Sequence, residues 1–123
     1  MPLDLLIVDD SAAIRKILER VLRQAGIPIG DVHQSGDGLE AIETLKSRNV
    51  GLILADINMP NMDGLELLGK LKEHPEWQRI PVIMVTTESS QNKVMKAVEL
   101  GAAGYIRKPF TADQIKSKLQ GFF

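Results

Sequence analysis

The chain has 123 residues, the size of one domain, and its 44% hydrophobic and 25% charged content is ordinary for a globular protein. It contains no cysteine, which excludes disulfides, thiolate metal sites and a thiol nucleophile. A net charge of -1 gives no electrostatic reason to expect nucleic-acid binding, and no apolar run approaches the roughly 20 residues of a membrane span. We therefore expect a single domain over residues 1–123, monomeric and cytoplasmic, with no membrane or nucleic-acid partner.

Short apolar runs indicate the strands of a parallel sheet. Four runs do not alternate with polar residues, as expected of strands that are covered on both faces. They lie at 5–8, 52–55, 82–85 and 105–106. A fifth and more polar segment, 31–35, suits an edge strand.

Between these runs the apolar residues recur at spacings of three and four, which predicts amphipathic helices. The five stripes are Ile14, Ile17, Leu18, Val21, Leu22 and Ala25; Leu39, Ile42 and Leu45; Leu65, Leu68 and Leu71; Val94, Ala97 and Val98; and Ile115, Leu119 and Phe122. Ser11 and Thr111 are placed to cap the first and last helices, and Gly26 and Gly101 to end the first and fourth. Five strand–helix alternations predict right-handed crossovers and a (βα)5 doubly wound α/β fold with helices on both faces.

Carboxylates stand where two of the buried strands end. Asp9 and Asp10 follow the run at 5–8, and Asp56 follows the run at 52–55, just before turn-forming residues at 60–64. If these strands are neighbours, the acids converge, and two unit charges 4 Å apart repel by about 4 kcal/mol at an effective dielectric of ~20. A raised pKa or a hard divalent cation such as Mg²⁺ would relieve that repulsion. A single acid here would more often be a helix cap or a turn residue, but three at strand ends favour a site.

A hydroxyl and an ammonium group follow the other two buried strands. Thr86 comes directly after the run at 82–85, and Lys108 follows the short run at 105–106 by one residue. A lysine can hold a phosphate as a point charge with three donors. Either residue alone could be structural or solvated, but one polar group at each strand end favours a site that handles phosphate.

From end to end the chain resembles the response-regulator receiver domains, most closely the single-domain chemotaxis regulators of the CheY type. The motifs that carry the resemblance are VDDS at 8–11, DINMPNMDGLELL at 56–68, PVIMVT at 81–86 and GAAGYIRKPF at 101–110. The resemblance implies a flavodoxin-like sheet with strand order 2-1-3-4-5.

The resemblance also implies a chemistry for the acids. Asp56 would accept a phosphoryl group from a phosphohistidine on a CheA-like histidine kinase. Asp10, Asp56 and the backbone carbonyl of Asn58 would bind Mg²⁺ directly, with Asp9 bound through water. Lys108 would pair with the phosphoryl group. Such a protein is a switch rather than an enzyme, although it promotes its own phosphorylation and dephosphorylation.

The output would depend on two further residues. By the same resemblance, Thr86 would bind a phosphoryl oxygen and Tyr105 would act as the switch aromatic, with a cis bond before Pro109. The face formed by the helix at 91–100, the strand at Tyr105 and the helix at 111–120 would then bind a target. The lack of an effector domain favours a chemotaxis role and a flagellar motor-switch protein as that target.

Three alternatives stay open at this point. The chain could be a receiver of another phosphorelay, either free-standing or cut from a larger protein. A haloacid-dehalogenase-like phosphohydrolase would need an acid where Asn58 stands, and a flavin carrier would need a phosphate-binding loop where VDDS places two acids. Thr87 departs from the small residue common in receiver domains, and we expect it to affect the rates of phosphorylation and dephosphorylation.

Overall fold

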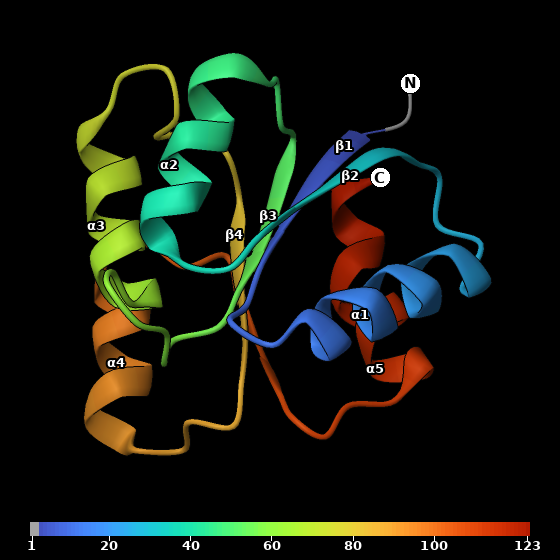
Figure 1. Ribbon diagram of the computed structural model, residues 1–123. Helices are drawn as coiled ribbons and strands as arrows, with labels where there is room; N and C mark the ends of the chain where they lie inside the picture. Colours follow the sequence, from blue (N-terminus) through green and yellow to red (C-terminus); the bar gives the residue numbers. More distant parts are fainter. Residues whose placement is uncertain (1–2) are drawn as a thin grey trace.

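A five-stranded parallel sheet forms the centre of the computed structural model, which describes residues 3–123, and its strand order is β2-β1-β3-β4-β5 (Figure 1). The strands are β1 (Leu3–Val8), β2 (Ile29–Ser35), β3 (Leu52–Ala55), β4 (Val82–Thr86) and β5 (Gly104–Arg107). The helices are α1 (Ala12–Gln24), α2 (Gly38–Ser47), α3 (Gly64–Glu73), α4 (Gln91–Glu99), α5 (Ala112–Leu119) and the 3-10 turn η1 (Gln120–Phe122). The predicted fold and strand order are confirmed.

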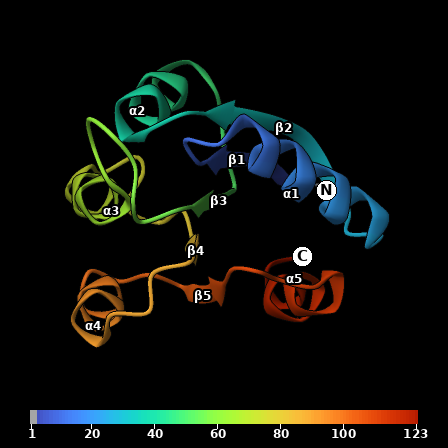
Figure 2. The same cartoon turned by 60° about the horizontal axis from the view of Figure 1, so that its bottom comes forward.

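Helices cover the sheet on both faces and enclose two separate cores. Helices α2, α3 and α4 lie on one face, and α1 and α5 lie on the other (Figures 1 and 2). Alternate strand residues point to opposite faces, so Leu6 of β1 belongs to the first core while Leu5 belongs to the second. No helix within residues 3–123 combines the length and apolarity needed to cross a bilayer.

The predicted helix ends are confirmed. The Ser11 side chain accepts a hydrogen bond from the N–H of Ile14, and Thr111 forms a reciprocal capping box with Gln114. Gly26 and Gly101 follow the last turns of α1 and α4 with φ angles of 74° and 93°, a backbone conformation that glycine adopts without strain.

Three predicted members of the helix stripes are exposed. Ile17, Leu39 and Val98 are 43%, 50% and 66% exposed. Conversely, Leu67 is fully buried in α3 although the stripe at 65, 68 and 71 omitted it. The apolar spacing identified the helices, but it did not fix how each helix is rotated about its axis against the sheet.

The connection from α3 to β4 is anchored by its aromatic residue. Trp77 packs against the first core and stacks on His74, with ring centroids 3.8 Å apart. Glu76 donates its backbone N–H to Nδ1 of His74. These contacts give Trp77 a structural place in the loop.

Candidate functional site

Lys108 joins the carboxylates that end two neighbouring strands. Its Nζ lies 2.5 Å from Oδ2 of Asp9, after β1, and 3.0 Å from Oδ2 of Asp56, after β3. The two acids are brought together because β1 and β3 pair in parallel, and Asp56 donates its N–H to the carbonyl of Val8. The three side chains are nearly buried, so the two ion pairs lie in a region of low dielectric.

The charge of Lys108 is fixed by its partners. Burial alone would lower the pKa of its ammonium group, but the hydrogen bonds to Asp9 and Asp56 and the attraction of both carboxylates outweigh burial. The pKa of Lys108 therefore lies above its ordinary value, and the group is positively charged at neutral pH.

A third carboxylate completes an acidic cluster. Asp9, Asp10 and Asp56 each offer an oxygen, and these oxygens lie within 4.8 Å of one another. Asp10 is exposed, whereas the other two acids are buried. Three carboxylates and one ammonium leave an excess of negative charge, and all-oxygen donors suit a hard divalent cation. The donor set therefore fits such a cation.

The Asp56 side chain is oriented by the loop that follows it. Its Oδ1 accepts hydrogen bonds from the N–H groups of Ile57, at 2.7 Å, and Asn58, at 3.4 Å. Gly64 donates its N–H to the carbonyl of Ile57, and a Cβ at Gly64 would lie only 2.1 Å from the carbonyl oxygen of Asp56. The Asp63-Gly64 pair thus does more than turn the chain: Asp63 caps α3, and Gly64 allows that helix to approach the acid.

Thr86 and Tyr105 both contact Glu88, a residue that was not predicted from the sequence. The Oγ1 of Thr86 accepts the N–H of Glu88, and the Tyr105 hydroxyl donates to the backbone carbonyl of Glu88. Burial, followed by the nearby carboxylates of Glu88 and Asp56, raises the pKa of the Tyr105 phenol. Two residues predicted to act in one switch are therefore connected through the segment 86–88.

Glu88 also connects the acidic site to α4. Its carboxylate accepts hydrogen bonds from the backbone N–H of Ser90 and the side-chain amide of Asn58, and these bonds lower its pKa. Lys93 of α4 lies 3.3 Å from both the Glu88 carboxylate and the Asn58 side-chain oxygen. The side chain of Asn58 thus faces α4. No sequence pattern singled out Glu88 or Lys93, because their contacts depend on the path of the β4–α4 loop.

Arg15 is a second residue that the sequence analysis missed. Its guanidinium donates to the backbone carbonyl of Asp9 at 2.5 Å and to the Gln34 side chain at 3.2 Å. Arg15 therefore ties the end of β1 to β2. The bond between Lys108 and Pro109 is cis, as the resemblance implied.

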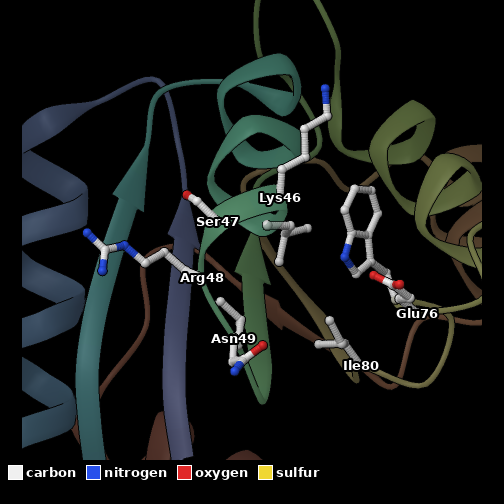
Figure 3. Close-up of a pocket in the computed structure, with 9 residues that line it drawn as sticks. Lys46, Ser47, Arg48, Asn49, Glu76 and Ile80 are labelled. Carbon is white, nitrogen blue, oxygen red and sulfur yellow. The ribbon is translucent and has the colours of Figure 1, made fainter.

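A pocket of about 290 Å³ lies at the opposite edge of the sheet, between the end of α2 and the connection to β4 (Figure 3). Lys46 and Arg48 extend in different directions there, and neither points toward Glu76 (Figure 3). The wall of the pocket also includes Trp77 and Ile80. Because the pocket gathers no set of converging polar groups, the acidic cluster and not this hollow is the candidate site.

Comparison with known proteins identifies the family. The model of the response regulator receiver domain matches residues 5–120. The chain belongs to the response regulator receiver domain family. Members of this family are signalling switches and not turnover enzymes, although they promote their own phosphorylation and dephosphorylation.

Individual receiver domains resemble the chain over nearly its whole length. It is 37% identical to the chemotaxis protein CheY-3 of Vibrio cholerae, over 97% of this chain and 90% of the relative. It is 40% identical to a CheY homologue of Campylobacter jejuni, over 94% of this chain and 88% of the relative. The structure of Vibrio cholerae CheY4 superposes with a TM-score of 0.88 at 31% identity and full coverage of both chains.

Proposed function

We propose that this receiver domain is a phosphorylation-activated switch in which Asp56 is the phosphoryl acceptor. The observation that carries the proposal is the position of Lys108 between Asp9 and Asp56 at the carboxyl ends of the strands. Phosphoryl transfer requires mainly positioning and neutralisation of charge. A buried carboxylate beside a cation supplies both.

In the proposed reaction an oxygen of Asp56 attacks the phosphorus of a phosphohistidine. The new P–O bond forms as the P–N bond breaks, and the imidazole nitrogen keeps the electron pair of the broken bond. The N–H of Ile57 fixes the Asp56 carboxylate, and Lys108 offsets the negative charge of the phosphoryl group. Mg²⁺, held by Asp10, Asp56 and the carbonyl of Asn58, with Asp9 through water, would supply additional charge neutralisation.

The proposed switch runs through Glu88. A phosphoryl group on Asp56 would add a charge of about -1.5 to -2 at the end of β3, the strand that pairs with the strand of Thr86. If the Thr86 hydroxyl turns to donate to that group, its contact with the N–H of Glu88 is lost. Because the Tyr105 hydroxyl binds the carbonyl of the same residue, movement of Thr86 would shift Tyr105 and the α4–β5–α5 face.

The chemotaxis relatives support a matching set of partners. We infer a cytoplasmic histidine kinase as the phosphodonor and a flagellar motor-switch protein as the target. A pull-down with beryllofluoride-activated protein should retain such a switch protein. If only a phosphotransfer protein is retained, the chain acts instead in another phosphorelay.

The acceptor role is tested by intact-mass spectrometry after incubation with a small phosphodonor and Mg²⁺. The unchanged protein should gain the mass of one phosphoryl group, and Asp56→Asn should gain none. Asp31→Asn, which changes an exposed acid on β2, serves as the matched control and should behave as the unchanged protein. A phosphoryl group that persists in Asp56→Asn would refute the assignment.

A further inference from the structure

The turn between β2 and α2 contacts both parts of the chain that flank the acidic site. At one end, Ser35 accepts the backbone N–H of Asp9 at 3.1 Å. At the other end, Asp37 and Gly38 contact the loop that follows Asp56. We name residues 35–38 the β2–α2 clamp. It spans the two chain segments whose spacing determines the geometry of the site.

Asp37 binds the far loop through its side chain. Its Oδ2 accepts a hydrogen bond from the side-chain amide of Asn61 at 2.7 Å, while Oδ1 accepts the N–H of Glu40 and caps α2. Asp37 is only 6% exposed. The Asn61 contact, followed by the N–H of Glu40, holds the pKa of Asp37 below its ordinary value even though burial opposes this. Asp37 is therefore an ionised acceptor with both oxygens in use.

A backbone contact lies beside this side-chain contact. Gly38, the first residue of α2, donates its N–H to the carbonyl of Met62 at 3.0 Å. A Cβ at Gly38 would lie 2.6 Å from the Met62 side chain, so a larger residue would force the two segments apart unless Met62 moved. Asn61, which makes the first of these two contacts, has a φ of 66°, a left-handed conformation that asparagine tolerates better than most residues.

The loop is thus held at two points with Asn58 between them. Its base is closed by the bond from the N–H of Gly64 to the carbonyl of Ile57. Its tip is held by the contacts of Asn61 and Met62 with the clamp. Neither Asp37 nor Asn61 belongs to the acidic cluster, so both would act on it only through the loop.

We propose that Asp37 and Asn61 are positioning residues that hold the loop 57–63 so that Asn58 keeps its backbone carbonyl in place for the cation. The proposal rests on the proposed function, because it assumes that the acidic cluster binds Mg²⁺. Groups that orient a metal ligand commonly change metal affinity by 10- to 100-fold when they are removed. Here the clamp acts on one backbone ligand, so the lower end of that range applies.

The test is a calorimetric titration with Mg²⁺ at fixed ionic strength. Asn61→Gly keeps the net charge and the left-handed backbone but removes the amide, and Asp37→Ser keeps a capping residue for α2 but cannot reach Asn61. We expect both variants to bind Mg²⁺ about tenfold more weakly than the unchanged protein. Asn49→Gly, at the opposite edge of the sheet (Figure 3), is the matched control and should leave affinity unchanged.

Exchanging the two residues separates the hydrogen bond from the added charge. In Asn61→Asp, two carboxylates face each other, so the loop should be displaced and Mg²⁺ binding weakened although the variant carries one more negative charge. In the double variant Asp37→Asn with Asn61→Asp, the amide donates in the reverse direction, the α2 cap is kept and the net charge is unchanged. The double variant should regain the affinity of the unchanged protein.

A second measurement tests how firmly the loop 57–63 is held in the absence of a cation. Hydrogen exchange of the Ile57 and Gly64 amides in metal-free protein should be faster in Asn61→Gly and Asp37→Ser than in Asn49→Gly. If the unchanged protein binds Mg²⁺ and the clamp variants bind it equally well, the clamp proposal is overturned while the proposed function stands. If the unchanged protein binds no Mg²⁺, the cation part of the proposed function fails and the clamp proposal falls with it.

Discussion

Single side chains in this protein often serve two neighbours at once. Lys108 contacts two carboxylates, Asp37 caps a helix and holds a loop, and the Glu88 carboxylate accepts hydrogen bonds from both Ser90 and Asn58. Replacing such a residue breaks two contacts together. The effects of variants in these groups are therefore not expected to add.

The phenol of Tyr105 gives a direct measure of its surroundings, because it is the single tyrosine of the chain. Burial and the neighbouring carboxylates disfavour the phenolate, so absorbance titration should give a pKa above the ordinary value of about 10. Glu88→Gln should lower that pKa toward the ordinary value, since it removes a nearby negative charge. Glu99→Gln, an exposed change at the end of α4, is the control. A Tyr105 pKa that is the same in all three proteins would contradict an effect of the Glu88 carboxylate charge on the phenol.

Asp37 predicts a pH dependence of stability. The folded-state pKa of its carboxyl is depressed, so the ionised group stabilises the fold above its unfolded-state pKa of about 3.9, and this stabilisation is lost as pH falls through the folded-state value. Urea unfolding should show Asp37→Ser as less stable than the unchanged protein at pH 7. The difference should narrow below pH ~4. A difference that stays constant down to pH ~2.5 would show that the ionised form is not what stabilises the fold.

At the scale of the elements, the strands were predicted more accurately than the helix faces. A buried strand in a parallel sheet is apolar on both sides, so the run at 52–55 needed no assignment of a face. A helix packs only one of its faces against the sheet, and neighbouring apolar residues leave the choice of that face ambiguous. Leu65 and Leu67 illustrate this, since the stripe included the first, which is only partly buried, and omitted the second, which is fully buried.

The stabilities of two leucine-to-alanine variants, one in a strand and one in a helix, can test this difference between strands and helix faces. Leu54 is fully buried in the central strand β3, so Leu54→Ala should lower the free energy of unfolding by about 2–5 kcal/mol. Leu39, at the start of α2, is 50% exposed although its spacing suggested a core position. Leu39→Ala should change stability by less than about 0.5 kcal/mol. Equal losses in chemical denaturation would mean that Leu39 is buried in solution.

The site was predictable to the extent that it consists of strand ends. Asp9, Asp10, Asp56 and Lys108 follow apolar runs, and parallel strands bring such residues to one edge of the sheet. The roles of Arg15, Glu88 and Asn61 were not predictable in this way. Their contacts depend on side-chain reach and loop conformation, which leave no periodic pattern in the sequence.

For the whole molecule, the proposed binding of Mg²⁺ by the acidic cluster predicts that the cation changes folding stability. An unfolded chain does not assemble the three carboxylates, so Mg²⁺ should stabilise the folded state. At a Mg²⁺ concentration ten times the dissociation constant, the free energy of unfolding should rise by about 1.4 kcal/mol. Thermal unfolding at constant ionic strength would measure this rise. The Asp9→Asn, Asp10→Asn double variant should not be stabilised by Mg²⁺. If Mg²⁺ stabilised this variant as much as the unchanged protein, the cation would bind elsewhere.

The ion pairs of Lys108 span 99 residues to Asp9 and 52 residues to Asp56. During synthesis both acids leave the ribosome long before their lysine does. A nascent or truncated chain that ends after β4 holds the carboxylates without their counter-charge. It therefore lacks the group that would offset the charge of a phosphoryl group on Asp56. If Asp56 is the phosphoryl acceptor, as proposed, only a chain that has docked β5 holds the counter-charge for the phosphoryl group, so signalling would require that the last strand of the sheet has folded into place.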